Sequence, residues 1–329
     1  MFSAIAQGYR QSSPPWRTLR RVLILLPTLL ACNHAYCDEG GVAFWFSGQY
    51  ASLAAVPATP GWSLPMQAYY WSGDASGSEA LTRGDSVALG LKGRVPLLLV
   101  QPTYAPEQKF LGGQASLGVG FGYGKNTTTA DVSVSPRGTE RERSDSVWGF
   151  TDLYPVASVA WNRGVHNWMT YVTGDIPTGD YDSKRLANIG IGHAAIDVGG
   201  GYTYLNQKTG REFSAVVGAT YNWENSDTNY KNGIDSHLDW GASQFLSANW
   251  EVGIAGYVYY QLTGDSGSGA KLGSFKSKVA AIGPQLGYAF TLGGLPAYAN
   301  LRGYWEFGAK NRLEGYALFA TVVIPLGSK

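Results

Sequence analysis

The chain has 329 residues, of which 44% are hydrophobic and only 15% are charged, so it can bury a large core and disorder is not expected. Its 25 Lys and Arg against 24 Asp and Glu give a formal net charge of +1, which leaves no basic surface for DNA or RNA. The 44 glycines, 21 tyrosines and 11 tryptophans are unusual for a helical bundle and typical of strands that line a barrel and face lipid.

Residues 1–37 have the features of a secretory signal peptide. Three arginines precede an apolar run over 22–31, and small or polar residues follow it up to Cys37. The run is about half the length of roughly 20 residues that a spanning helix needs, so it predicts a cleaved signal, with cleavage after Cys37. Lipidation at Cys32 remains as an alternative. Both cysteines lie in this leader, so we expect the mature chain to lack disulfides and thiolate metal sites.

The next segment, 38–61, precedes the first expected strand and is too apolar for a free tail. It contains the runs Phe44-Trp45-Phe46 and Leu53-Ala54-Ala55-Val56-Pro57. We expect it to act as a plug inside a barrel formed by residues 62–329, or to line the periplasmic mouth of that barrel.

Hydrophobicity alternates with period two along the rest of the chain, which predicts β-strands. Clear examples are the segments 212–224, 250–262 and 297–307. In the first, the apolar parity holds Phe213, Ala215, Val217, Ala219, Tyr221 and Trp223. Periodicity alone does not separate a soluble sandwich from a barrel with its apolar face toward lipid. Length favours the barrel, because these segments run for about 10–14 residues and a tilted strand crosses hydrocarbon in about 9–11.

Long polar gaps and short turns follow one another along the chain, as in outer-membrane barrels. The gaps lie near 72–84, 125–145, 174–190, 224–235, 264–275 and 308–312, and the turns near 106–111, 162–164, 206–210, 247–249 and 293–296. We therefore expect an all-β, transmembrane, antiparallel barrel of about 12 strands with up-and-down topology. Pro96 and Pro102 interrupt the second strand, which we expect to be bent, bulged or divided.

The polar parity of the strands predicts the residues that line the lumen. These candidates are Asp152, His193, Asp197, Glu212, Glu224, His237, Asp239, Glu251, Tyr257, Tyr259, Arg302 and Glu306. Charges of both signs beside tyrosines would make a path for amphipathic solutes. The alternative is that these groups pair with one another and fill the interior.

Histidines could indicate chemistry, and three of them remain after the leader. His193 shares a parity with Asp197, and His237 shares one with Asp239, so each pair is expected to point into the lumen from one strand. A barrel hydrolase could combine such a pair with Ser243 or Ser214, but a triad is a spatial object that this spacing does not define. A polar network that stiffens the lumen explains the same residues more simply.

Two further patterns are weak signals for ligands. The glycines of 118–122 and 199–201 are flanked by strands, whereas a nucleotide loop needs a helix after it. Asp175, Asp180 and Asp182 lack the regular spacing of a calcium loop and are better explained as a solvated surface loop. We expect no cofactor and no metal.

Several runs resemble the MetA-pathway family of phenol degradation, a group of outer-membrane proteins. They are 44–57 (FWFSGQYASLAAVP), 151–155 (TDLYP), 161–162 (WN), 173–181 (TGDIPTGDY), 186–190 (LANIG), 221–225 (YNWEN), 235–240 (DSHLDW) and 283–288 (GPQLGY). The resemblance covers nearly the whole mature chain. It implies a transporter-like barrel associated with the catabolism of aromatic or other hydrophobic compounds, and it transfers no catalytic residue.

The sequence thus predicts a channel in the bacterial outer membrane for passive uptake of small hydrophobic or aromatic compounds, and not an enzyme. We expect its partners to be outer-membrane lipid and small-molecule solutes, including aromatic ones, and no nucleic acid; the sequence does not define the oligomeric state. The alternatives are a barrel hydrolase and a structural or adhesive barrel.

Overall fold

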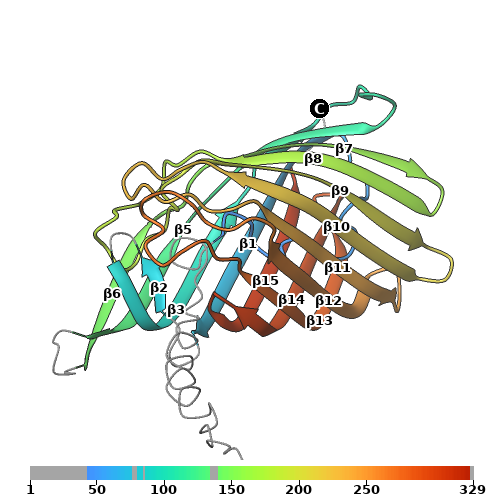
Figure 1. Ribbon diagram of the computed structural model, residues 1–329. Coiled ribbons are helices and arrows are strands. Elements are labelled where there is room, and N and C mark those ends of the chain that lie inside the picture. The colour runs from blue at the N-terminus through green and yellow to red at the C-terminus, as the bar shows by residue number, and fades with distance from the viewer. Residues whose placement is uncertain (1–42, 76–79, 84–85, 134–139, 327–329) are drawn as a thin grey trace, which may run out of the picture. The chain divides into compact units, whose positions relative to one another are not determined.

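The computed structural model describes residues 43–75, 80–83, 86–133 and 140–326, and all regular elements in this part are β-strands (Figure 1). The expected signal peptide, its cleavage site and Cys32 lie outside the described residues. No helix in the described ranges has the length and apolar character needed to cross a bilayer.

The strands follow one another along a single sheet. They are β1 (Gly61–Asp74), β2 (Ala80–Arg83), β3 (Ser86–Val100), β4 (Thr103–Ala105), β5 (Gln114–Ser133), β6 (Glu140–Phe150), β7 (Tyr154–Arg163), β8 (His166–Asp175), β9 (Ala195–Asn206), β10 (Arg211–Asn222), β11 (Asp235–Phe245), β12 (Trp250–Gln261), β13 (Lys278–Leu292), β14 (Leu295–Lys310) and β15 (Glu314–Pro325). Every pairing between them is antiparallel.

The sheet closes into a barrel because β1 pairs with β15, from Ser63↔Pro325 to Asp74↔Glu314. β3 and β4 together make one crossing, since both pair with β1 and with β5. β6 and β7 make another, since both pair with β5. With β2 as a short extension paired to β3, the structure has 12 crossings, and the predicted fold class and strand number are confirmed. Closure leaves no long open edge in the membrane.

Prolines explain why the second crossing of the barrel is divided into β3 and β4. β3 ends before Gln101 and Pro102, and β4 starts at Thr103. Pro96 stays inside β3, where it lies opposite Tyr70 of β1, but the paired register with β5 is interrupted between Arg94 and Leu97. A proline cannot donate to the ladder, so the strand divides at one proline and loses local pairing at the other.

The apolar side chains of the strands point outward, which is the inverse of a soluble protein. On β10, Val217 is 59% exposed, while Val216 and Ser214 are fully buried. On β14, Trp305 is 62% exposed, while its neighbour Tyr304 is buried. Such a surface is stable only against acyl chains, so the predicted orientation of the alternating strands is confirmed.

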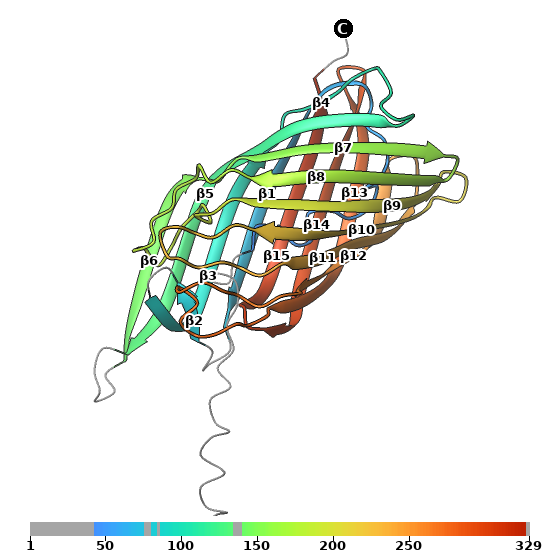
Figure 2. The same cartoon turned by 45° about the horizontal axis from the view of Figure 1, so that its top comes forward.

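The connections agree with the expected alternation at most positions. Long segments join β8 to β9, β10 to β11 and β12 to β13. Short turns join β7 to β8, β9 to β10, β11 to β12 and β13 to β14. The prediction of a loop over 125–145 was wrong, because β5 and β6 continue as a paired hairpin from Lys125↔Trp148 to Ser133↔Glu140. The run Thr127-Thr128-Thr129 has high β-propensity, which favours continued pairing. Figures 1 and 2 show this hairpin projecting beyond the neighbouring strands.

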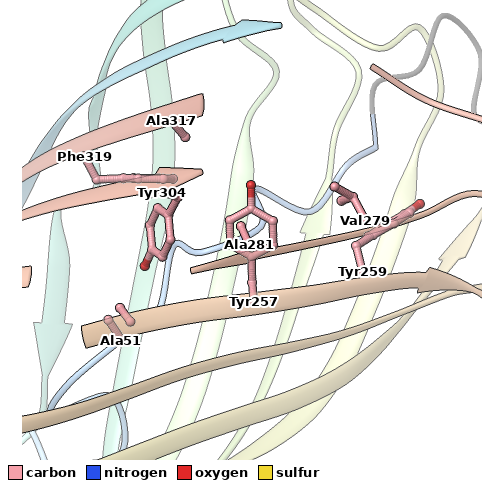
Figure 3. Packing of buried hydrophobic residues seen from close by; sticks show 9 residues of the cluster. Ala51, Tyr257, Tyr259, Val279, Ala281, Tyr304, Ala317 and Phe319 are labelled. Carbon is pink, nitrogen blue, oxygen red and sulfur yellow. The ribbon is translucent and has the colours of Figure 1, made fainter. Parts of the chain in front are cut away.

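The barrel interior is packed with side chains rather than empty. One buried cluster joins Tyr257 and Tyr259 of β12 with Tyr304 of β14, Phe319 of β15 and Ala51 of the segment before β1 (Figure 3). A second cluster joins Trp45 and Ala55 of that segment to Tyr171 of β8 and Val216 of β10. Residues 43–60, which we call the N-terminal segment, therefore pack against the inner wall of the barrel.

Candidate functional site

The inner wall carries a buried polar surface that holds the N-terminal segment. Asp197, Glu212, His237, Asp239 and Glu251 lie on β9 to β12 and are each at most 4% exposed. They fall on the polar parity of their strands, opposite the apolar outward parity. Burying so many polar groups requires hydrogen-bond partners, and the N-terminal segment supplies many of them.

Asp239 and Arg302 hold the segment from two sides. Asp239 accepts the backbone N–H of Gly48 at 2.9 Å and of Tyr50 at 3.2 Å. Arg302 of β14 donates through Nη1 to the carbonyl oxygens of Gly48 at 3.1 Å and Gln49 at 3.0 Å. A carboxylate on the amides and a guanidinium on the carbonyls are charge-assisted contacts, stronger than neutral ones.

Glu212 forms the second anchor. Its carboxylate accepts the Ser52 hydroxyl at 2.5 Å and the Leu53 N–H at 2.9 Å. It also accepts the hydroxyls of Ser243, at 2.8 Å, and of Ser214. Both serines that could have served a hydrolase therefore donate to a carboxylate.

His237 is the centre of a buried network next to Trp45. Its Nε2 lies 3.0 Å from Asp197 and 3.3 Å from the hydroxyl of Tyr171, which in turn donates to Asp197 at 2.7 Å. The Trp45 ring stacks on the imidazole with centroids 3.5 Å apart. His237 and Asp239 are both buried on the inner face of β11, and register across the sheet also brings His237 to Asp197 of β9, across β10.

The phenol of Tyr50 is also buried in this region. Burial raises the pKa of Tyr50 to about 12, and the carboxylates of Asp239 and Asp197 contribute to the same shift. The hydroxyl is therefore neutral at physiological pH. Its ring lies 5.9 Å from Trp45 and 6.0 Å from Tyr171, so the aromatic groups of the segment and of the wall form one packed unit.

The remaining inward acids accept hydrogen bonds from aromatic side chains of other strands. Glu251 accepts the hydroxyl of Tyr298 at 2.9 Å. Glu306 accepts the hydroxyl of Tyr257 at 2.7 Å and the indole N–H of Trp71 at 3.2 Å. These contacts stiffen the wall between β12, β14 and β1.

Three candidates lie outside the regular strands. Asp152, between β6 and β7, accepts the N–H groups of Gly179 at 2.7 Å and Ile191 at 2.9 Å. His193 precedes β9 and lies 3.3 Å from the amide of Asn232. Glu224 is exposed two residues after β10 ends at Asn222, where the strand alternation stops.

A cavity of about 150 Å³ lies between the N-terminal segment and the barrel wall. Eight of its 22 lining residues are Phe, Tyr or Trp, and it receives polar groups from β8, from the segment 188–193 and from β14. The lining includes Phe44, Phe46, Tyr69, Trp71, Tyr154, Asp175, Ile189, His193, Tyr257, Glu306 and Arg312. Sequence reasoning did not assign Phe44, Phe46, Tyr69 or Trp71 to this site, and no single-strand pattern could have grouped them.

The other two sequence patterns remain structural. The glycines of 118–122 lie within β5 and those of 199–201 within β9, with strands on both sides. Asp180 accepts the N–H of Phe150 at 3.1 Å, and Asp182 accepts the N–H of Lys184 at 2.9 Å. Among the described residues, no three His, Cys, Asp or Glu side chains gather as a metal site would require.

A closed 12-strand barrel with an apolar exterior and a polar interior defines the class: this is a bacterial outer-membrane β-barrel with the fold of an outer-membrane channel. Residues 73–322 match the family described as "Putative MetA-pathway of phenol degradation", and the chain belongs to that family. The resemblance drawn from the sequence is thereby confirmed.

The chain is similar to several solved structures, and the first of those named here has the same fold. The COG4313 outer membrane channel from Pseudomonas putida F1 is similar with a TM-score of 0.64 and 12% identity, over 82% of this chain and 97% of that one. A Pseudomonas aeruginosa FadL homologue has a TM-score of 0.42 and 9% identity, over 88% and 98% of the two chains. The transport unit of the autotransporter AIDA-I from Escherichia coli has a TM-score of 0.45 and 12% identity, over 82% and 91%. No curated protein sequence matches the chain.

Proposed function

We propose that this barrel admits small hydrophobic or aromatic compounds across the outer membrane by passive diffusion. The observation that carries the proposal is the cavity between the N-terminal segment and the wall. Its lining is rich in Phe, Tyr and Trp, and its volume of about 150 Å³ equals that of an engineered cavity in another protein that binds benzene. An apolar pocket with a few convergent polar groups is the usual form of a small-molecule site.

We further propose that residues 38–61 act as a plug that narrows the lumen, with the twelve candidate residues of the polar parity lining the path. The contacts of Asp239, Arg302 and Glu212 support this role, because each side chain forms a hydrogen bond with the backbone of the N-terminal segment. A solute would pass either through the gap beside the segment or through the lumen after the segment has moved out of it.

A hydrolase is not favoured by the geometry. Ser243 and Ser214 donate to Glu212, whereas His237 lies against Asp197, Tyr171 and Trp45. A general base has to reach the hydroxyl that it activates. The solved structure of similar fold with a TM-score of 0.64 is an outer membrane channel.

Uptake into whole cells tests the proposal. Porin-deficient Gram-negative cells with an intact lipopolysaccharide layer would express the full chain or an empty vector, and uptake of radiolabelled toluene, phenol and raffinose would be timed. We expect faster entry of toluene and phenol, no change for raffinose, and no effect of an uncoupler on the initial rate.

A matched pair of loop variants links uptake to the cavity. Ile189→Trp places a large ring in the cavity from the segment between β8 and β9 and should slow toluene entry. Ile234→Trp makes the same exchange in another outer segment, at a residue that does not line the cavity, and should match the unaltered chain. Equal toluene entry with and without the chain would contradict the proposal.

A further inference from the structure

One acid in the cavity differs from all the others described above. Asp175 is the last residue of β8, lines the cavity and is only 4% exposed. Neither of its carboxylate oxygens has a hydrogen-bond partner. A buried carboxyl group without partners is costly, so its position calls for a ligand that supplies donors.

The neighbouring acids show what a satisfied carboxylate looks like here. Asp152 accepts two backbone N–H groups. Glu306 accepts an indole N–H, a phenol hydroxyl and the N–H of Gly315. Arg312, which also lines the cavity, places its guanidinium 4.6 Å over the ring of Tyr259. Asp175 is thus the acid of this cavity that remains available to a bound molecule.

The aromatic side chains of the cavity pack against one another in an arrangement that suits an aromatic ring of a bound molecule. Phe46 meets Tyr69 edge-on at a centroid distance of 5.6 Å and Tyr154 at 6.0 Å. Phe44 lies 6.1 Å from Tyr154. Aromatic walls offer faces and edges to a flat molecule and also attract a cation that lies over a face.

We propose that the cavity selects single-ring aromatic molecules that carry a hydrogen-bond donor, with the ring between the aromatic walls and the donor on Asp175. This inference rests on the proposed function and names its substrate class. An ammonium group fits best, because it carries the charge opposite to a carboxylate, and an uncharged hydroxyl fits second. A molecule with the same ring and no donor leaves Asp175 unpaired and is disfavoured.

Binding to the purified full chain in nanodiscs tests this selection. The probes are benzylamine, benzyl alcohol and toluene, which share a ring and differ in the group attached to it. Tryptophan fluorescence reports binding, since Trp45 and Trp71 line the cavity, and empty nanodiscs correct for partition into lipid. We expect benzylamine to bind at least about tenfold more tightly than toluene, with benzyl alcohol between them.

The variant Asp175→Leu keeps a similar shape and removes both acceptor oxygens. It should bind all three probes within about threefold of one another, because the apolar walls remain. It should also unfold at a temperature equal to or above that of the unaltered chain, since it removes an unpaired buried acid; this readout shows that the variant is folded. Asp74→Asn, an exposed acid at the end of β1 outside the cavity, is the matched control and should keep the preference for amine.

The outcomes separate this inference from the proposed function. Equal affinity for benzylamine and toluene in the unaltered chain, or an amine preference that survives in Asp175→Leu, overturns the role of Asp175 even where cells take up toluene. An amine preference that depends on Asp175 supports the site even where whole cells show no added uptake, and the proposed function then fails alone.

Discussion

Gly48 packs tightly between two tyrosines of the barrel wall. Its φ is +83°, and a Cβ there would lie 2.8 Å from Cδ1 of Tyr257 and 2.9 Å from Cε2 of Tyr304. Gly48→Ala should therefore lower the thermal unfolding temperature and expose the segment to limited proteolysis. Gly164→Ala is the control, because Gly164 also has a positive φ of +66° but nothing within 4 Å. The left-handed backbone costs both variants about 1 kcal/mol, and only Gly48→Ala adds a clash. Equal behaviour of the two variants would contradict the close packing.

Arg302 is the cation that holds the same turn of the segment. Arg302→Met keeps much of the side-chain length but loses the bonds to the carbonyl oxygens of Gly48 and Gln49. We expect larger and noisier single-channel currents in planar bilayers, because the segment would leave its position more often. Arg302→Lys keeps the charge but not the planar guanidinium with its paired donors. Its currents should therefore fall between those of the unaltered chain and those of Arg302→Met. Unchanged currents in Arg302→Met would show that the segment does not limit the pore.

Strand β10 has an apolar face that points outward and a polar face that points into the barrel, so a charge on its outward face tests the contact with lipid. Val217 is 59% exposed in the middle of β10, and Val217→Lys would place a charge against acyl chains at a cost of about 2–4 kcal/mol near the midplane. The fraction of heat-modifiable, folded protein in the membrane should fall. Ser226→Lys, in the exposed segment after β10, should fold as the unaltered chain does. Normal folding of Val217→Lys would mean that this face does not meet lipid.

At the same scale, the sequence predicted the strands better than the contacts between them. Period-two alternation identified the outward face of β10, β12 and β14, because lipid imposes one rule along the whole length of a strand. The hairpin of β5 and β6 was missed, since outside the membrane that rule ends and polar Thr-rich strands resemble a loop. The His237–Asp197 contact was missed as well, because it depends on register across β10, which alternation does not define.

The cavity required still more information than register. It joins Phe44 and Phe46 of the N-terminal segment with Tyr154 of β7 and Asp175 of β8. The apolar character of residues 38–61 led us to expect a segment within the barrel or at its mouth, but the sequence does not say which wall it meets. Only barrel closure, which places β1 beside β15, brings these side chains around one space.

For the molecule as a whole, charge is distributed unevenly between interior and surface. The formal net charge is only +1. In the described part of the chain, however, nine Asp and Glu residues are buried, whereas Arg302 is the one buried residue among its Lys and Arg. The acids are Asp152, Asp175, Asp197, Glu212, Asp235, Asp239, Glu251, Asp265 and Glu306. The other Lys and Arg residues whose burial the structure describes are half-buried or exposed. An ion inside the barrel meets an acidic wall at short range and little compensating positive charge.

This distribution predicts that any ion current through the barrel prefers cations. In planar bilayers with a tenfold KCl gradient, we expect a reversal potential that indicates K⁺ permeating several-fold better than Cl⁻. The double variant Glu212→Gln, Asp239→Asn should reduce this preference, while Asp74→Asn at the exposed end of β1 should leave it unchanged. Buried charges are screened less than surface charges, so the preference should persist from 0.1 M to about 1 M salt, where the Debye length falls to about 3 Å. A preference for Cl⁻, or one that vanishes at high salt, would place the selecting charges on the surface instead of the inner wall.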